Sequence, residues 1–236
     1  MGMMWWRGRT RPPTVSFYHD IEQDCGGVAD VARCRCIVGE FLRLEKQYGV
    51  AATYNVVGRL FREQPDLIEM IRAGGQEVAF HSYHHQPDWR PAYYAEEVRL
   101  CREASPLPRG YRSPRSEWDR ETIRACWRQG LSWSAEADPA GEPYLIYRGL
   151  VRLPIAGDDW SLHTGKRSPR QWVEYFSDML LRRRYVAFGS HDCVASFAPQ
   201  ERLGAWEELL KRAVAAGAEL VSLSAAADAC RLARRV

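Results

Sequence analysis

The stretch that decides the fold is residues 50–82, VAATYNVVGRLFREQPDLIEMIRAGGQEVAFHS. Its two ends, 50–58 and 76–82, are short apolar runs typical of buried strands, and 64–75 between them has the pattern of an amphipathic helix that ends in two glycines. Strands that alternate with helices in this way form βαβ units, whose strands lie parallel in one sheet. The segment therefore predicts an α/β fold.

The same alternation extends along the chain in both directions. Further strands are predicted at 14–21, 131–136, 149–155, 185–192 and 219–224, with a short strand or a turn at 109–114. Further helices are predicted at 28–49, 92–104, 120–130, 168–184 and 199–217, with a last helix after 224. This makes about seven βα units, so we expect a parallel sheet covered by helices, either a barrel or an open sheet. In both architectures functional residues gather at the carboxyl ends of the strands.

The composition limits the class of protein. Hydrophobic residues make up 46% of the 236, which is enough for a packed core. The net charge of +3 arises from well-mixed acids and bases, so we expect no nucleic-acid partner. The sequence has no run of about 18 apolar residues, and it therefore predicts no integral membrane segment.

Residues 1–13 precede the first strand and lack the roughly 7–15-residue apolar stretch of a signal peptide. We interpret them as a poorly ordered leader before a single domain at 14–236. Seven cysteines are scattered along the chain, and without a secretion signal we expect reduced thiols and a cytoplasmic protein. The sequence leaves the oligomeric state open.

Two carboxylates follow the first strand. Asp20 and Glu22 are two residues apart, so in an extended chain they point to one face. Two carboxylates on one face repel each other unless a cation or a proton lies between them. The pair indicates either a cation site or a solvated acidic loop.

Histidines follow the third strand, in HSYHH at 81–85. His81 and His85 are four residues apart, and if the chain turns helically after the strand, both rings fall on one side. Two histidines and one carboxylate are a common ligand set for a catalytic divalent metal. The alternative is a loop that is merely polar.

Three further strand ends carry polar residues that fit a catalytic site. They are Arg112 beside Pro114 in GYRSPRSEW, Asp158, Asp159, Trp160 and His163 in GDDWSLH, and His191 and Asp192 in FGSHDCV. Each has an ordinary structural explanation, such as a surface arginine, an acidic turn or a hydrogen-bonding histidine. A βα scaffold would bring all five segments to one end of the sheet, so their joint occurrence predicts a single active site there.

The order of these motifs resembles that of the NodB-type polysaccharide deacetylases, carbohydrate esterase family 4, over roughly residues 14–224. The matching segments are HDIE (19–22) for the family's acidic motif, HSYHH (81–85) for His-Ser/Thr-x-x-His, RSP (112–114) for Arg-x-Pro, DDW (158–160) for Asp-Trp, and FGSHD (188–192) for an apolar strand that ends in His. The resemblance implies a distorted (β/α)7-type barrel formed by one domain.

The resemblance also implies a role for each site residue. Glu22, His81 and His85 would hold a divalent metal, zinc before cobalt, nickel or manganese. Asp20 would be the general base, paired with Arg112, and His191 the general acid, oriented by Asp159. Trp160, Pro114 and Arg115 would contact the substrate. Since Glu22 stands where many members have Asp, it could exchange roles with Asp20, or Asp24 could join the site.

By this resemblance the chain is a metal-dependent hydrolase that removes the N-acetyl group from an amino sugar in a polymer, a glycolipid or a glycosylated metabolite, and releases acetate. Two alternatives remain: a deformylase or other amide hydrolase on the same metal scaffold, and a non-catalytic carbohydrate-binding relative. Trp89, Trp118, Trp133 and Trp160 lie near predicted loops, where their rings could stack on sugars or simply fill the core and rim.

Overall fold

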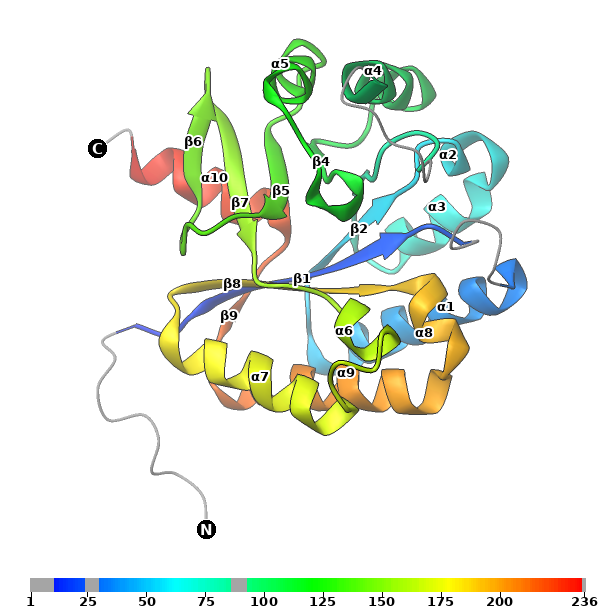
Figure 1. Ribbon diagram of the computed structural model, residues 1–236, viewed down its shortest axis with the longest axis vertical. Helices are drawn as coiled ribbons and strands as arrows, with labels where there is room; N and C mark the ends of the chain where they lie inside the picture. The colour runs from blue at the N-terminus through cyan, green and yellow to red at the C-terminus, as the bar shows by residue number, and fades with distance from the viewer. Residues whose placement is uncertain (1–10, 24–29, 86–92, 235–236) are drawn as a thin grey trace.

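The computed structural model describes residues 11–23, 30–85 and 93–234 and shows a parallel barrel wrapped by helices (Figure 1). The parallel strands are β1 (Thr14–Ile21), β2 (Ala52–Val56), β3 (Glu77–Phe80), β4 (Gly110–Tyr111), β5 (Trp133–Ala137), β7 (Leu150–Ile155) and β8 (Tyr185–His191). Their order in the sheet is β7-β5-β4-β3-β2-β1-β8. The predicted α/β class and βα alternation are confirmed.

The two ends of this sheet meet just beyond β7. Gly157 forms a parallel bridge with Phe188 of β8. The hydrogen bonds there run from the Ala156 N–H to the Ala187 carbonyl, 2.8 Å, and from the Gly189 N–H to the Gly157 carbonyl, 3.0 Å. Since only this short segment closes the ring, the sheet is a distorted barrel, and the open-sheet alternative is excluded.

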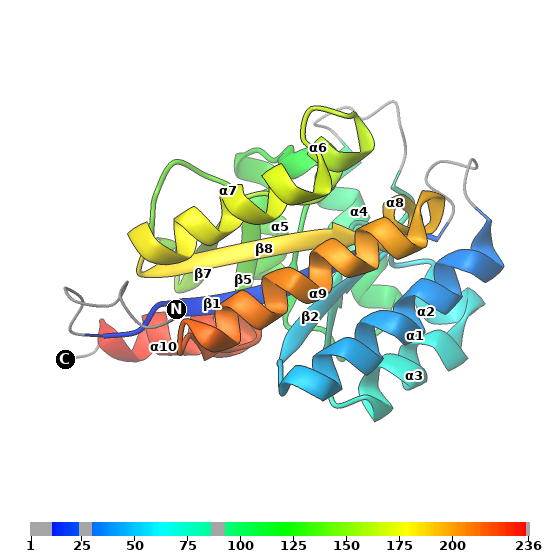
Figure 2. The same ribbon diagram turned by 90° about the horizontal axis from the view of Figure 1, so that it is seen from below.

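Helices cover the outside of the barrel (Figure 2). They are α1 (Val31–Tyr48), α2 (Leu60–Glu63), α3 (Pro65–Ala73), α4 (Tyr94–Ala104), α5 (Arg120–Arg128), α6 (Trp160–His163), α7 (Pro169–Arg182), α8 (Asp192–Phe197), α9 (Pro199–Ala215) and α10 (Leu223–Ala233), with a 3-10 turn at Pro114–Ser116. None of the helices within the described ranges is both long and apolar enough to cross a membrane.

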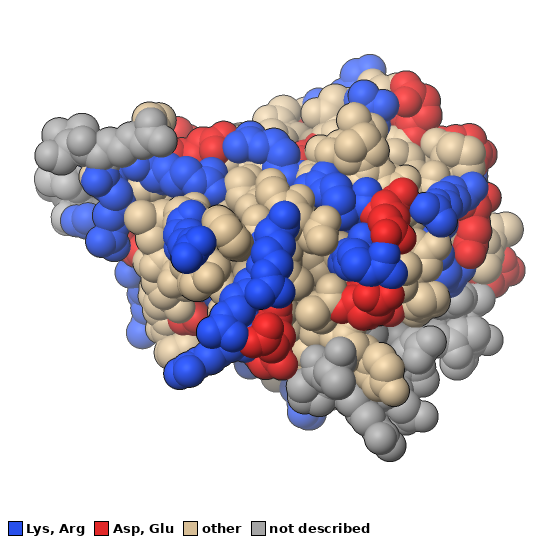
Figure 3. All heavy atoms as spheres, turned by 90° about the horizontal axis from the view of Figure 1, so that it is seen from above, with Lys and Arg blue, Asp and Glu red and all other residues tan. Residues whose placement is uncertain are grey.

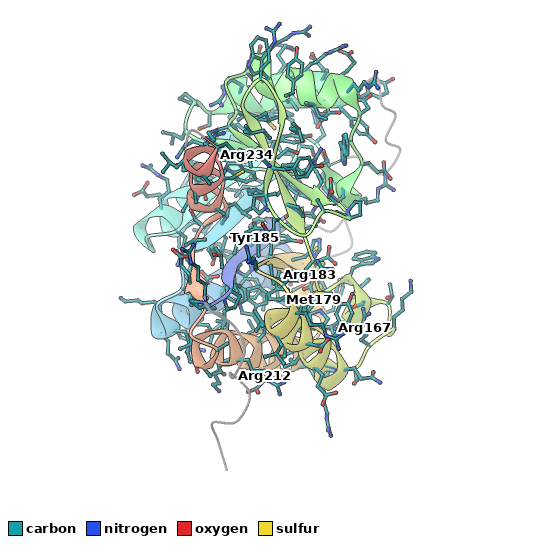
Figure 4. The ribbon with its side chains drawn as sticks, turned by 90° about the vertical axis from the view of Figure 1, so that its left-hand side faces the viewer. Arg167, Met179, Arg183, Tyr185, Arg212 and Arg234 are labelled. Atoms are coloured by element: carbon teal, nitrogen blue, oxygen red, sulfur yellow. The ribbon has the colours of Figure 1, made fainter. Side chains whose placement is uncertain are left out.

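Local signals account for the positions of the long helices. Asp30 caps α1, which ends at Gly49 in the left-handed conformation with φ 65°, as the sequence predicted. Ser168 and Gln171 form a capping box at the start of α7, with Pro169 in the first turn. Figure 4 shows the opposite end of α7, where Met179 and Arg183 lead into Tyr185 at the start of β8.

Some short elements were not predicted. α8 begins directly after β8, and β6 (Tyr144–Tyr147) runs antiparallel to β7. The strand expected at 219–224 is only Glu219–Leu220, because Ser222 caps α10 and ends the extended segment. These elements are too short for a hydrophobic period to develop.

Aromatic side chains fill the barrel. Trp133 and Tyr18 are fully buried, and a Cβ built on Gly110 or Gly189 would lie 1.9 Å from the Trp133 ring or 2.1 Å from the Tyr18 ring. Only glycine allows the strands to approach these rings so closely. Trp133 is therefore a core residue, so of the two alternatives for this ring the core position is the one that the structure supports.

The surface carries both signs of charge. Figure 3 shows basic and acidic side chains interspersed on the face above α4 and α5. Many of them form ion pairs along one helix, such as Arg99 with Glu96 and Arg124 with Glu121. This mixed pattern matches the modest net charge of +3.

Candidate active site

The carboxyl ends of the parallel strands surround a cavity of about 570 Å³. The predicted site residues that line it are Glu22, His81, His85, Arg112, Pro114, Arg115, Trp160 and His191, and the other lining residues are Ser116, Ala137, Ile155, Gly157 and Asp158. Asp20 and Asp159 are buried just behind this wall and contact residues that line it. The structure thus brings together all ten predicted side chains, from five separate strand ends.

Glu22, His81 and His85 form one cluster of ligand-type atoms. Glu22 Oε1 lies 3.1 Å from His85 Nε2 and 3.6 Å from His81 Nε2. All three residues offer atoms within 4.8 Å of one another, and the side chain of His85 is 25% exposed to the cavity. Burial alone would raise the pKa of Glu22, but the two imidazoles hold it well below its usual value. The carboxylate is therefore ionised and faces both rings.

The hydrogen bonding of His81 tests whether these residues fit a metal ion. His81 Nδ1 lies 3.0 Å from the backbone carbonyl oxygen of Arg112, which can only accept, so Nδ1 carries the hydrogen. Its Nε2 is buried and has no hydrogen-bond partner among the residues that the structure describes. A bare imidazole nitrogen beside a second imidazole and a carboxylate is a donor set that suits a divalent metal. The residues present fit such an ion.

The sequence argument for pairing His81 with His85 required a helical turn after β3. The structure has no helical turn in residues 81–85, which it describes. Ser82 and His85 both have positive φ, 54° and 53°. Ser82 Oγ accepts the His85 N–H at 3.1 Å and supports this tight turn. The two rings still meet, with centroids 5.0 Å apart. The pairing of His81 with His85 therefore comes from a compact loop and not from helical spacing.

His84 points away from the cluster. Its Nδ1 lies 2.7 Å from Glu97 Oε1, and its backbone N–H donates to Glu97 Oε2, also at 2.7 Å. Glu97 also accepts the Tyr83 N–H at 2.8 Å, so this buried carboxylate of α4 anchors the loop from outside. Of the three histidines, only His81 and His85 face the cavity.

Asp20 is fully buried at the end of β1. Arg112 Nε donates to its Oδ2 at 2.7 Å, and Asn55 Nδ2 donates to its Oδ1 at 2.8 Å. Burial raises the pKa of Asp20, but the Arg112 guanidinium and the nearby histidines lower it below the usual value. The side chain is held as a carboxylate, with both oxygens fixed in direction.

The His191 ring lies beside the Asp20 carboxylate. Its Nε2 lies 3.5 Å from Asp20 Oδ2 and 3.9 Å from Glu22 Oε1. On the other side its Nδ1 donates to Asp159 Oδ1 at 2.6 Å, and Ser190 Oγ donates to Asp159 Oδ2 at 2.7 Å. Burial lowers the pKa of His191, but the Asp159 carboxylate outweighs it and holds the pKa well above its usual value. The geometry suits a proton donor.

A second group of ligand-type atoms comprises Asp158, Asp159 and His191. Asp159 already accepts hydrogen bonds from Ser190 Oγ, His191 N and His191 Nδ1. This carboxylate is therefore largely satisfied by the protein. The bare Nε2 of His81 makes the Glu22 cluster the better candidate for a metal.

The rim of the cavity holds the predicted substrate residues. Arg115 and Ser116 have positive φ, 53° and 56°, in the 3-10 turn that follows Arg112. Pro114 is buried, and the Arg115 side chain is 54% exposed and lies 3.4 Å from Glu117 Oε1. Trp160 is 50% exposed at the start of α6, with its ring 6.3 Å from that of His191.

Sequence reasoning missed several buried residues that support the site. Asp192 accepts the N–H groups of Glu22 at 3.0 Å and of Gln23, and so holds the loop that presents Glu22. Glu136 accepts the Ser113 N–H at 2.9 Å and lies between Arg112 and Arg152. The sequence analysis noted Asp192 at a strand end but gave it no role. Glu136 could have been found as an acidic residue at the end of an apolar strand.

The remaining predictions concern two tryptophans, Asp24 and the leader. Trp118 covers the Arg152 guanidinium at 4.1 Å and does not line the cavity. The predictions for Asp24, Trp89 and most of the leader at 1–13 lie outside the described residues.

Comparisons with known proteins place part of this chain in a known sequence family. Residues 24–132 match the model of the polysaccharide deacetylase family. A chitooligosaccharide deacetylase from Bradyrhizobium sp. (strain ANU 289) is 36% identical over 102 residues, which cover 38% of this chain and 46% of the relative. The match thus spans about half the length of that relative.

Two solved structures show how far the fold is shared. A putative polysaccharide deacetylase from Mycobacterium smegmatis superposes with a TM-score of 0.79 at 19% identity, covering 96% of this chain and 93% of that one. A Puue allantoinase superposes with a TM-score of 0.67 at 15% identity, covering 93% of both chains. The resemblance found in the sequence and the predicted (β/α)7-type barrel are confirmed, but this fold alone does not decide the substrate.

Proposed function

We propose that this chain, which matches the polysaccharide deacetylase family over residues 24–132, is a divalent-metal-dependent hydrolase that removes the N-acetyl group from an N-acetylated amino sugar and releases acetate. One observation carries the proposal. The cluster of Glu22, His81 and His85, in which His81 Nε2 has no hydrogen-bond partner among the described residues, adjoins the Asp20 carboxylate and the His191 imidazole, whose nearest atoms lie 3.5 Å apart.

Glu22, His81 and His85 would hold the metal. Two imidazoles and one carboxylate are a set typical of catalytic zinc, and cobalt, nickel or manganese would also suit these donors. When bound there, the ion supplies Lewis-acid polarisation of the amide carbonyl and an acidified water as nucleophile. Glu22 stands in the ligand position because its oxygen faces both imidazole rings, whereas Arg112 and Asn55 occupy the oxygens of Asp20.

Asp20 would act as the general base. The water loses a proton to the Asp20 carboxylate as its oxygen attacks the carbonyl carbon. Arg112 keeps Asp20 ionised and fixes its Oδ2 within 3.5 Å of His191 Nε2. Such a proton transfer contributes typically ~10²–10⁴-fold to the rate.

His191 would act as the general acid. As the carbon–nitrogen bond breaks, Nε2 of His191 gives its proton to the departing amine nitrogen, and acetate and a free amino sugar result. Asp159 keeps His191 protonated and fixes the ring through Nδ1. The base and acid lie 3.5 Å apart at their nearest atoms, so both can reach one tetrahedral centre.

Two other functions share this scaffold. A deformylase or cyclic-amide hydrolase would use the same groups, and the superposition on an allantoinase makes that class relevant. A non-catalytic carbohydrate binder is less well supported, because side chains suited to the roles of base, acid and metal ligand lie close together.

The test is product analysis with the metal-loaded protein. N-acetylated and N-formylated glucosamine derivatives and a cyclic ureide are incubated with zinc-, cobalt-, nickel- or manganese-loaded enzyme, and acetate, formate and free amine are measured. The proposal predicts acetate and free amine in equal amounts from the acetylated substrates. Formate release or ring opening with no acetate would instead assign one of the other hydrolases, and metal-bound protein that hydrolyses none of them would indicate a binder.

A further inference from the structure

Glu136 is a buried carboxylate behind the cavity wall that the proposed mechanism does not use. It lies near the end of β5 and is fully buried. Its Oε1 accepts the Ser113 N–H at 2.9 Å and the Ser134 hydroxyl at 3.0 Å. Its Oε2 has no hydrogen-bond partner among the described residues, and Arg112 Nη1 lies 3.9 Å from it. One oxygen is thus bound by the protein, and the other faces the guanidinium that holds Asp20.

This carboxylate contributes little to the stability of the fold. Burial raises the pKa of Glu136 to about 7, although Arg152 and Arg112 oppose the shift. Arg152 is also fully buried, with Nη1 3.9 Å from Glu136 Oε1, and Trp118 covers its guanidinium at 4.1 Å. Buried charge pairs are often no more stable than a well-packed apolar core, because removing the charges from water costs free energy. Stability alone therefore does not explain a carboxylate at this position.

Three carboxylates surround the Arg112 guanidinium. Nε donates to Asp20 Oδ2 at 2.7 Å, Nη1 lies 3.9 Å from Glu136 Oε2, and Nη2 lies 3.6 Å from Asp158 Oδ2. Asp158 lines the cavity, and its side chain is 22% exposed. Because a guanidinium readily forms two parallel hydrogen bonds to one carboxylate, Arg112 could turn toward Asp158 and release Asp20. The negative charge of Glu136 beside Nη1 opposes that rotation.

The end of β5 also holds the turn that follows Arg112. Glu136 Oε1 binds the Ser113 N–H at the start of this turn. The Ala137 N–H donates to Ser116 Oγ at 2.9 Å, and Arg112 Nη1 donates to the same oxygen, also at 2.9 Å. Ser116 has a positive φ, a conformation that persists only where surrounding contacts hold it. Glu136 and its neighbour thus fix both the turn and the Nη1 side of Arg112.

We propose that Glu136 is a positioning residue that holds the Arg112 guanidinium on Asp20, and that without its charge Arg112 turns toward Asp158 and leaves Asp20 misdirected. This rests on the proposed function, in which Asp20 takes a proton from the attacking water. Misplacing a reacting group by about 1 Å can lower a rate by ~10²-fold, so a small rotation of Arg112 is enough for a measurable loss. Glu136 does not line the cavity, and it therefore acts through Arg112.

The first test removes the charge and keeps the shape. In Glu136→Gln the amide oxygen still accepts the Ser113 N–H, and the amide NH2 group faces Arg112 in place of Oε2. At pH 8, above the pKa of Glu136, kcat for acetate release from a β-1,4-linked N-acetylglucosamine oligomer should fall by about three- to thirtyfold. KM and metal affinity should change by less than about twofold, and the variant should be at least as stable as wild type. Unchanged kcat, or a loss of kcat together with stability, contradicts the proposal.

Two further variants separate positioning from general damage. Glu77→Gln removes a half-buried carboxylate that accepts hydrogen bonds from Thr53 and Ser224, at the opposite end of β3 from the cavity, and kcat should stay the same. Arg112→Lys removes the group through which Glu136 acts, so adding Glu136→Gln to it should lower kcat by no more than about twofold further. A similar loss in Glu77→Gln, or the full loss in the Arg112→Lys background, overturns the proposal.

A measurement on the guanidinium itself needs no turnover. In protein with 15N-labelled arginine, the Arg112 Nε–H signal is identified by its absence in Arg112→Lys. It should exchange slowly with solvent in wild type, because it donates to the buried Asp20 carboxylate, and about tenfold faster or more in Glu136→Gln. If wild type hydrolyses no N-acetylated sugar but the exchange rate depends on Glu136, the proposed function fails and the positioning role stands. Equal exchange rates in the two proteins overturn the positioning role.

Discussion

The His81 imidazole donates its Nδ1 hydrogen to the backbone carbonyl oxygen of Arg112 over 3.0 Å. This contact joins the ends of β3 and β4, and it has two consequences. It leaves His81 Nε2 bare for a metal, and it ties the ligand to the same residue whose guanidinium holds Asp20. The proposed ligand set and the proposed base are thus positioned by one residue.

The three histidines of HSYHH should behave differently. His81→Ala and His85→Ala should each lose the metal, by more than the roughly 10- to 100-fold in affinity that is typical of removing an outer hydrogen-bond partner. His84→Ala is the matched control and should keep the metal, because that ring pairs with Glu97 outside the cavity. Elemental analysis of the three purified variants decides, and equal loss in His84→Ala would contradict the assignment.

The length of Glu22 should matter to metal affinity. The Glu22 N–H donates to Asp192, which fixes the backbone at this position. The backbone therefore cannot shift to bring the carboxylate of a shorter side chain to the two imidazole rings. Glu22→Asp should weaken metal binding by at least about tenfold, or ~1.4 kcal/mol. Competition with a chelator of known affinity measures this. Unchanged affinity in Glu22→Asp would contradict the claim that the length of this side chain sets the metal affinity.

Removal of the proposed acid should separate catalysis from metal binding. His191→Ala should retain the metal and lose ~10²–10⁴-fold in kcat. Asp159 raises the pKa of His191, and only the protonated ring can donate, so activity is present below that pKa and is lost as pH rises through it. Asp159→Asn should therefore move the alkaline limb of the kcat profile to lower pH. A limb that stays in place, or loss of metal from His191→Ala, would rule out this role.

Much of this arrangement can be predicted from the sequence, for reasons that the structure makes clear. Buried strands such as Thr14–Ile21 and long amphipathic helices have a strong hydrophobic period, and parallel strands place their carboxyl ends together. The supporting residues have no such signal. In the sequence, Asn55 is only a polar residue in a predicted strand. Its hydrogen bond to Asp20 depends on the register of β1 and β2, which places the two residues side by side.

The conformation of the HSYHH loop could not be predicted either. Helical spacing suggested that His81 and His85 would meet, and they do, but through positive φ values at Ser82 and His85 that no period encodes. The burial of Glu136 and Arg152 could not be predicted either. Both side chains are fully buried, and their contacts are with the Ser113–Ser116 turn and with Trp118, which no sequence period indicates.

Glu136 should make the stability of the fold depend on pH. Burial raises the pKa of Glu136 to about 7, from its usual value of 4.5, although Arg152 and Arg112 partly oppose this. Its contribution is therefore fully present below about pH 4.5 and is lost as pH rises through about 7. Glu136→Gln keeps an acceptor for the Ser113 N–H but does not titrate.

Relative to the wild type, the free energy of unfolding of Glu136→Gln should thus rise between pH 5 and pH 8, by roughly 3 kcal/mol at most. Urea unfolding at the two pH values measures the difference. Glu117→Gln, at a partly exposed acid near the same turn that accepts a hydrogen bond from the Tyr94 hydroxyl, is the control and should show a smaller change. A constant offset between Glu136→Gln and wild type would contradict the raised pKa.

The central claim is that a metal held by Glu22, His81 and His85 supports hydrolysis of an N-acetyl group with Asp20 as base. The most direct test measures acetate release from a β-1,4-linked N-acetylglucosamine oligomer against the amount of metal bound, for wild type and Asp20→Asn. Wild type should release acetate in proportion to bound metal, lose the activity on chelation and regain it on reloading. Asp20→Asn should bind metal, but its rate of acetate release should be lower by at least ~10²-fold. Acetate release that is independent of bound metal, or undiminished in metal-loaded Asp20→Asn, would contradict the claim.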